Sequence, residues 1–209
     1  SQMDQTKKEE FWNTLTHFIG IVLSLAGFPL LIMSNNDLSS FSLVSILFFE
    51  FGLLFVYISS TLYHYVDNIK LKKKLRTLDH ISIFYLIAGS YAPVCLITLY
   101  NHSGIEIFII VLTIMLTGTF FKLFYTGKYE RFSLFLYLAM GWLIVFKINT
   151  LIDLISFNGL ALIIASGLFY TLGTFFYSSK KIKNSHAIWH LFVLGGSTTH
   201  YLFVLFFII

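Results

Sequence analysis

Residues 42–66 read SLVSILFFEFGLLFVYISSTLYHYV and contain a single carboxylate, Glu50, and a single histidine, His64. A helix rises about 1.5 Å per residue, so about 20 apolar residues cross the hydrocarbon core of a bilayer. The apolar residues are continuous rather than alternating, which favours a helix over a strand of a membrane barrel. The basic run KLKKKLR at 70–76 follows closely. This stretch predicts a transmembrane helix with a positively charged connection at one end.

The composition of the whole chain agrees with a membrane protein. Of its 209 residues, 57% are hydrophobic and only 11% are charged, whereas a soluble domain carries about 25% charged residues. Such a chain could not cover a water-facing surface, which excludes a soluble enzyme, a disordered chain and a nucleic-acid binder despite the net charge of +4. The one cysteine, Cys95, excludes an internal disulfide and a cysteine-based zinc finger.

Similar apolar stretches recur along the chain. We therefore expect an all-α, integral membrane bundle of seven transmembrane helices that forms a single domain over residues 1–209. Short connections make neighbouring helices antiparallel. The seven expected spans are approximately Phe11–Met33, Ser42–Val66, Asp79–Tyr100, Ile105–Tyr125, Phe132–Leu151, Ile155–Tyr177 and His186–Ile209.

The basic residues are distributed unevenly between the two ends of the expected bundle. Thirteen of the 14 Lys and Arg residues precede the first span or lie in or around the second, fourth and sixth connections, and only Lys147 lies towards the other end. Positively charged connections remain on the cytoplasmic side of a membrane. The sequence therefore predicts a cytoplasmic N terminus and an outer C terminus, the reverse of a G-protein-coupled receptor.

Several ionisable side chains lie inside the expected spans, where a charge costs about 2.5–3.5 kcal/mol at the bilayer centre. Such residues are functional candidates for that reason. From their depth we expect six of them to share one layer near the cytoplasmic leaflet: His17, His64, Asp79, His80, His186 and His190.

The pair His186 and His190 forms an H-x-x-x-H motif, which places both imidazoles on one face of a helix. Such a pair can bind one metal ion, although a chance pair is common in soluble helices. His64 offers a third nitrogen at matching depth. Three histidines would leave the fourth tetrahedral position open, as in catalytic zinc sites, and the ligand type favours Zn²⁺.

Asp79 and Ser60 are the candidates for catalysis. Asp79 could hold a water molecule at the open position or act as its base, but an aspartate at the start of a helix is also a common N-cap. Ser60 lies one helical turn before His64 and could orient the water or the ligand. A serine hydroxyl that bonds back to its own helix is the simpler interpretation of that spacing.

The remaining buried candidates receive supporting roles. We expect His17 to donate a hydrogen bond to a ligand or to another histidine, and His80 to serve as an outer-shell or packing residue. His200 lies about 15 Å beyond His190, too deep for the same metal shell, but it faces the same interior. Glu50 is expected to line that interior as a protonated, hydrogen-bonded group; a proton or cation path is the alternative.

Six separate motifs occur in order along the chain, between residues 10 and 193. They are E-x-x-N-T-x-T-H-x-x-G at 10–20, STLYH at 60–64, LDHISIFYLIAGSYAP at 78–93, YLAMGWL at 137–143, GLFYTLG at 167–173 and HAIWHLFV at 186–193. In these motifs and their order the chain resembles the hemolysin III family, the bacterial branch of the progestin and adipoQ receptor family that includes the adiponectin receptors.

The resemblance implies a zinc ion held by His64, His186 and His190, with Asp79 contacting it through water and Ser60 as the motif serine. It also implies kinship with the alkaline ceramidases, which are grouped as metal-dependent lipid hydrolases. The chain as given lacks the long N-terminal region of the animal receptors, so we expect no protein hormone as a partner. We expect a compact protein of the bacterial cytoplasmic membrane.

Three functions follow as hypotheses. The first is a zinc-dependent hydrolase that cleaves an amide or ester of a membrane lipid, with the lipid or fatty acid in an intramembrane cavity, and that serves lipid homeostasis. The second is a sensor of membrane lipids in which the zinc is structural. The third, a pore-forming hemolysin, requires an ion path lined by Glu50, Lys147 and His200.

Overall fold

A computed structural model describes residues 5–179 and 181–209, so residues 1–4 and the basic residue Lys180 lie outside the described residues. All regular elements in the described part are helical. They are α1 (Lys7–Ser34), α2 (Ser42–Tyr65), α3 (Ile69–Pro93), the π-helical turn η1 (Val94–Thr98), α4 (Gly104–Tyr125), α5 (Glu130–Trp142), the 3₁₀ turn η2 (Leu143–Lys147), α6 (Ile148–Leu154), α7 (Phe157–Ser178) and α8 (Ser185–Phe207).

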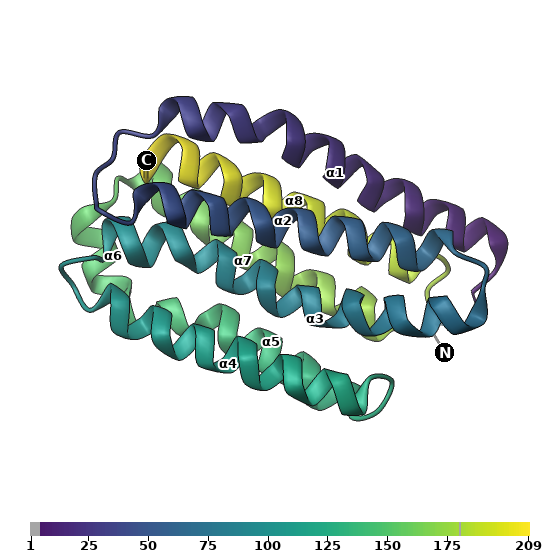
Figure 1. The fold of residues 1–209 in the computed structure, drawn as a ribbon. Coiled ribbons are helices and arrows are strands. Elements are labelled where there is room, and N and C mark those ends of the chain that lie inside the picture. The colour runs from purple at the N-terminus through teal and green to yellow at the C-terminus, as the bar shows by residue number, and fades with distance from the viewer. Residues whose placement is uncertain (1–4, 180) are drawn as a thin grey trace.

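Seven helical stretches of the described residues are long and apolar enough to cross a membrane. The fifth stretch, 130–154, combines α5, η2 and α6. In Figure 1 the helices run side by side along one axis, and the beginning of α1 and the end of α8 lie at opposite ends of the bundle. Together these features indicate an integral membrane bundle with seven spans.

The helices pack in the order that positions α2 and α8 near the middle. α2 packs most extensively against α3, α7 packs against α8, and α1 covers both α2 and α8. α4 and α5 lie on the far side of α3 from α1 (Figure 1). The interior therefore contains α2, α3 and α8, which are the elements that carry most of the buried ionisable residues.

The outside of the bundle is apolar. Met33, Phe146 and Phe157 each expose more than four fifths of their surface (82%, 85% and 83%). Exposed aromatic and aliphatic side chains of this kind occur on all the long helices. A water-soluble monomer rarely carries contiguous apolar surface on this scale, so the side faces of the bundle match a lipid environment.

α3 begins at Ile69, ten residues earlier than the predicted start at Asp79. Asn68 is its N-cap, and the Asn68 side chain accepts a hydrogen bond from the Leu71 backbone N–H. The first turns carry basic residues, so hydropathy alone places the start of the helix too late, although lysine and leucine are good helix formers. Asp79 is therefore an interior helical residue, and its interpretation as a cap is wrong.

α2 and α3 cross at a close backbone contact. A Cβ atom on Gly52 would lie 2.6 Å from the Tyr85 carbonyl oxygen, and one on Gly89 would lie 2.9 Å from the Phe48 carbonyl oxygen. Backbone atoms cannot move aside as a flexible side chain can. Small residues at such crossings let transmembrane helices approach closely. This crossing holds α2, which carries His64, in a fixed position against α3, which carries Asp79.

The fifth span is interrupted, where the sequence predicted one continuous helix over Phe132–Leu151. α5 ends at Trp142, and a 3₁₀ turn precedes α6. The hydroxyl of Tyr91, from α3, donates to the Met140 carbonyl oxygen at 2.8 Å and accepts from the Ile144 backbone N–H at 2.9 Å. A helix can break inside a membrane when another group satisfies the freed backbone atoms, and Tyr91 does so here.

Replacing Tyr91 by phenylalanine should destabilise the protein by about 1–3 kcal/mol, because the partly buried Ile144 N–H loses its acceptor. The measurement is thermal unfolding of the purified protein in detergent. Tyr125→Phe is the matched control, since Tyr125 is exposed and removal of its hydroxyl leaves the break untouched. Equal melting temperatures for Tyr91→Phe and the wild type would show that Tyr91 does not hold the break.

Candidate metal centre

Three histidines from two helices meet inside the bundle. His64 lies in the last turn of α2, while His186 and His190 lie in the first two turns of α8. Each ring offers one nitrogen, and the three nitrogens all lie within 4.8 Å of one another. The i, i+4 spacing stacks the two imidazoles of α8 on one face, with ring centroids 4.6 Å apart.

The spacing of the nitrogens suits a metal ion. The Nε2 atoms of His64 and His186 are 3.2 Å apart. Two nitrogens that each bind a tetrahedral zinc at about 2.0–2.1 Å are separated by roughly 3.3–3.4 Å. All three side chains are buried, so the cluster is shielded from competing ligands in bulk solvent. The three histidines could therefore hold a metal ion.

The outer nitrogens of two of these rings are held by α1. His64 Nδ1 donates to Glu10 Oε2 at 2.6 Å. His190 Nδ1 donates to the Asn13 carbonyl oxygen at 3.0 Å, and Thr16 Oγ1 lies 3.1 Å from the same nitrogen. A hydrogen bond from one ring nitrogen leaves the other nitrogen available to a metal. α1 thus orients His64 and His190 but contributes no ligand atom to the cluster.

The sequence did not predict the contacts of α1 with His64 and His190, although Glu10, Asn13 and Thr16 lie in the first of the six motifs. Their spacing gives a usable signal: positions 10, 13, 16 and 17 fall on one face of a helix. What the spacing cannot give is the partner, because the rotation of α1 against α2 and α8 decides which rings that face contacts.

Asp79 and Ser60 lie beside each other inside the bundle. Asp79 is buried on α3 and lies outside the group of potential ligand atoms, but it lines the same cavity as His186 and His190. Ser60 is fully buried beside Asp79. Its Oγ meets the geometry of a hydrogen bond with none of the described residues. The interpretation of Ser60 as a hydroxyl bonded back to its own helix is therefore wrong.

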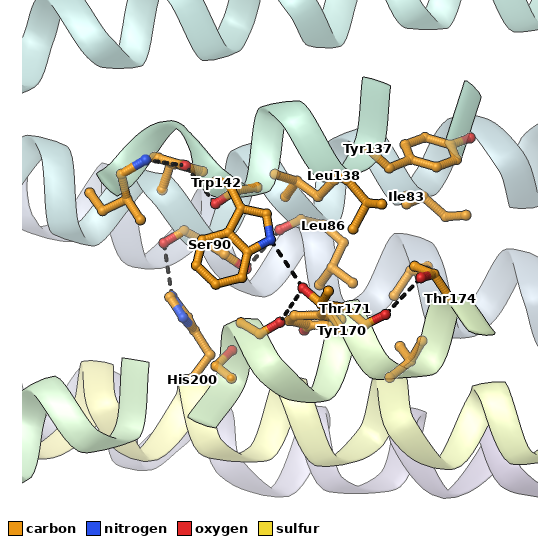
Figure 2. Close-up of a pocket in the computed structure, with 18 of the residues that line it drawn as sticks. Ile83, Leu86, Ser90, Tyr137, Leu138, Trp142, Tyr170, Thr171, Thr174 and His200 are labelled. Carbon is orange, nitrogen blue, oxygen red and sulfur yellow. Dashed lines mark hydrogen bonds between the residues drawn. The ribbon is translucent and has the colours of Figure 1, made fainter. Parts of the chain in front are cut away.

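A cavity of about 200 Å³ extends from the histidine cluster through the bundle, between α3, α5, α7 and α8. Its polar end carries Asp79, His186 and His190, and its wall is otherwise mostly aliphatic and aromatic. Figure 2 shows Ile83 and Leu86 on one side and Tyr170 on the other. Trp142 lies between α5 and α7, where its Nε1 donates to Thr171 Oγ1 at 3.0 Å.

Three further histidine candidates lie close to the cavity. His200 lines it far from the cluster and contacts the Ser90 carbonyl oxygen through Nε2 at 2.9 Å (Figure 2). His17 stacks on His190, with centroids 3.5 Å apart, and neither of its nitrogens has a hydrogen-bond partner among the described residues. His17 therefore contacts His190 by ring stacking rather than by a hydrogen bond. His80 lines the same cavity, and its Nδ1 lies 3.6 Å from Glu130 Oε1.

Glu50 is buried inside the bundle, as expected, but it is not on the wall of the cavity that His186 and His190 line. Its side chain is close enough to Tyr201 for an electrostatic interaction. The Tyr201 hydroxyl donates to the Gly27 carbonyl oxygen, which places this region where α1, α2 and α8 meet. The expected hydrogen bond of Glu50 is also missing, since both carboxyl oxygens lack a partner among the described residues. Fourteen residues return within about 40° of the azimuth of His64, which is enough to turn Glu50 towards this neighbouring interface.

A second, polar hollow of about 550 Å³ opens beside the cluster, between α1 and the ends of α2 and α3. Glu10, His64, Lys72 and Asp67 line it. The histidine cluster thus lies between an apolar cavity on one side and a polar hollow on the other.

Comparison with known proteins places the chain in a family. The sequence profile described as haemolysin-III related matches residues 5–201. The chain is 40% identical over 203 residues to the hemolysin-3 homolog of Bacillus subtilis (strain 168), covering 97% of the chain and 95% of that protein. It is 36% identical over 210 residues to hemolysin-3 of Bacillus cereus, with 100% and 96% covered. It is 31% identical over 200 residues to the human monocyte to macrophage differentiation factor, with 90% and 80% covered. No solved structure gives a significant match.

Proposed function

Because the chain belongs to the haemolysin-III related family, we propose that it is a zinc-dependent membrane hydrolase that cleaves an amide or ester bond of a membrane lipid. One observation carries this proposal. The buried cluster of His64, His186 and His190 opens, beside Asp79, into an apolar cavity inside the bundle. A metal site joined to an apolar cavity suits a lipid whose scissile bond lies at the polar end.

His64, His186 and His190 would hold the zinc, with His64 and His186 binding through Nε2. Three protein ligands leave one position for water or substrate, as in catalytic rather than structural zinc sites. A zinc ion bound there would polarise the substrate carbonyl and lower the pKa of a water ligand towards about 7. The donor set agrees with this choice of metal, since imidazole nitrogens in a tetrahedral arrangement are typical zinc ligands.

Asp79 and Ser60 would carry the proton transfers and the charge stabilisation. The Asp79 carboxylate lines the same cavity as His186 and His190 but lies outside the histidine group, which suits a base that takes the proton from the attacking water. The Ser60 hydroxyl, beside Asp79, would donate a hydrogen bond to the carbonyl oxygen as that oxygen gains negative charge. The proton held by Asp79 would then pass to the leaving group.

The substrate would be an acyl lipid that enters the cavity tail first. The aliphatic lining of the cavity would bind the acyl chain, and the few polar groups would hold the carbonyl near Asp79. α5 and α7 contact each other sparsely, and the Trp142–Thr171 hydrogen bond spans the gap between them. A lipid would enter laterally at this gap. The proposed role is membrane lipid homeostasis.

The proposed site lies near the cytoplasmic leaflet of a bacterial cytoplasmic membrane. The support for this placement is the charge distribution, since basic residues gather at the end of the bundle that contains the N-terminal part of α1 and the α2–α3 connection. The His64 end of α2 and the His186 end of α8 belong to this same end.

The proposal is tested by the release of fatty acid from a panel of ceramides, phospholipids and lipid esters. Purified protein in detergent should release fatty acid from at least one of these, as measured by mass spectrometry. Removal of zinc with a chelator should abolish release, and added Zn²⁺ should restore it. If the zinc-loaded protein releases no fatty acid from any lipid of the panel, the proposed hydrolase function is wrong.

A non-catalytic lipid sensor is the second candidate, and one observation favours it. All three histidines come from α2 and α8, so a metal ion would tie these two helices together beside the cavity. This candidate predicts that metal removal lowers the melting temperature while the zinc-loaded protein has no turnover. A pore receives less support, because of its three required residues only His200 lines the cavity, and Glu50 and Lys147 do not.

A further inference from the structure

We infer that Glu10 of α1, held by Lys72 of α3, is a positioning residue that sets the orientation of His64 and thereby the metal affinity of the three-histidine cluster. This inference rests on the proposed metal site. It concerns residues to which neither the family match nor the motifs assign a role. Glu10 acts through His64, because its carboxylate lies outside the group of nitrogens that could bind one ion.

The contact between Glu10 and His64 selects one form of the imidazole. An ionised carboxylate only accepts hydrogen bonds, so the 2.6 Å contact assigns the proton to His64 Nδ1. The lone pair is then on Nε2, which is the atom that faces His186 Nε2 at 3.2 Å. A metal needs that lone pair. The carboxylate on the far side of the ring also makes Nε2 a more basic ligand.

Lys72 fixes the other oxygen of the same carboxylate. Its Nζ lies 2.7 Å from Glu10 Oε1 and 5.1 Å from the centre of the Tyr63 ring. The side chains of Lys72 and Glu10 are only 10% and 16% exposed, so the pair is shielded from solvent. Glu10, on α1, therefore bridges Lys72 on α3 and His64 on α2. Because Lys72 fixes the carboxylate, the hydrogen bond to that carboxylate restricts rotation of the His64 ring.

Glu10 is the side chain on which this arrangement can be tested. The matching contact of His190 is with the backbone carbonyl of Asn13, which no side-chain substitution removes. Glu10 lies on the wall of the polar hollow, so its replacement leaves the apolar cavity unchanged. Glu10→Gln keeps the size of the side chain but removes the charge. Its amide has one acceptor oxygen, whereas Lys72 Nζ and His64 Nδ1 both donate and each need an acceptor.

The first measurement is zinc affinity, by competition with a fluorescent chelator in detergent. Glu10→Gln should weaken binding by about 10–100-fold, the usual cost of losing an outer-shell partner, and Lys72→Met should weaken it less. The matched control is Glu106→Gln, which removes an exposed carboxylate in α4. Glu10→Gln and Lys72→Met break the same ion pair, so the metal-free proteins should show similar losses of melting temperature relative to Glu106→Gln, while Glu10→Gln loses more zinc affinity. Unchanged zinc affinity in Glu10→Gln, or a loss no larger than that of Lys72→Met, would overturn the inference.

The second measurement uses metal-free protein, so it is independent of whether zinc binds or any lipid is cleaved. Nitrogen NMR of histidine-labelled protein, with His64→Gln for assignment, reports which ring nitrogen carries the proton. We expect His64 to be protonated on Nδ1 in the wild type and in Glu106→Gln, and to become a mixture of both forms in Glu10→Gln. An Nδ1-protonated His64 that persists in Glu10→Gln would overturn the role of Glu10. A wild type with this tautomer but no zinc binding would instead contradict the proposed function.

Discussion

His190→Ala is expected to abolish zinc binding, lowering the metal content of the purified protein from about one ion per chain to background. His190 offers one of three nitrogens that lie within 4.8 Å of one another. Removing a direct ligand should cost more than the about 10–100-fold typical of an outer-shell partner. The substitution also removes the ring on which His17 stacks, so the effect on stability should be large as well. Elemental analysis after dialysis measures the zinc content.

The matched control is His102→Ala. His102 is exposed in the connection between η1 and α4, far along the chain from the cluster. It should retain the zinc content and melting temperature of the wild type. His64→Ala should behave as His190→Ala does, which separates loss of the site from a local defect in α8. Full zinc content in either His64→Ala or His190→Ala would show that the three-histidine cluster is not the metal site.

Asp79→Asn is expected to abolish hydrolysis while zinc remains bound. The substitution keeps the shape of the side chain but removes the base, and a general base contributes about 10²–10⁴-fold to a rate. Two of the three histidines do not depend on Asp79 for their positions, because Glu10 holds His64 and the Asn13 carbonyl holds His190. The measurements are fatty-acid release and zinc content on the same preparation.

Asp153→Asn provides the comparison, since Asp153 is an exposed carboxylate on α6. It should cleave lipid at the wild-type rate. If Asp79→Asn cleaves as fast as Asp153→Asn, Asp79 is not the base. If it loses zinc together with activity, Asp79 supports the metal rather than the proton transfer.

Hydropathy predicted the helical spans well because the bilayer imposes a simple requirement on length and polarity. It failed where other forces act. α3 extends back to Ile69 because a capped, lysine-rich turn can remain helical outside the apolar region. The break after Trp142 is invisible in the apolar sequence, because its cause is a hydroxyl on another helix, that of Tyr91.

Part of the candidate site could also be predicted from local helix geometry, and the rest depends on how the helices pack. The H-x-x-x-H pair is local, so helix geometry alone places His186 and His190 on one face. His64 could be added by depth along its span. Glu10 and Glu50 show the limit of such reasoning, since both are acids on membrane helices and spacing does not distinguish them. The rotation of each helix brings Glu10 to a histidine and leaves Glu50 with neither oxygen bonded among the described residues.

The seam between α1 and α8 joins segments that are far apart along the chain. The contact of His190 with the Asn13 carbonyl links residues 177 positions apart, and the contact with Thr16 links residues 174 apart. Contacts of such separation form late, after loop closure has brought distant segments together. During synthesis α1 is therefore made long before its partner α8, and the contacts between α1 and His190 form only after α8 has been inserted. A chain released before α8 is made would lack His186 and His190, two of the three histidines of the cluster.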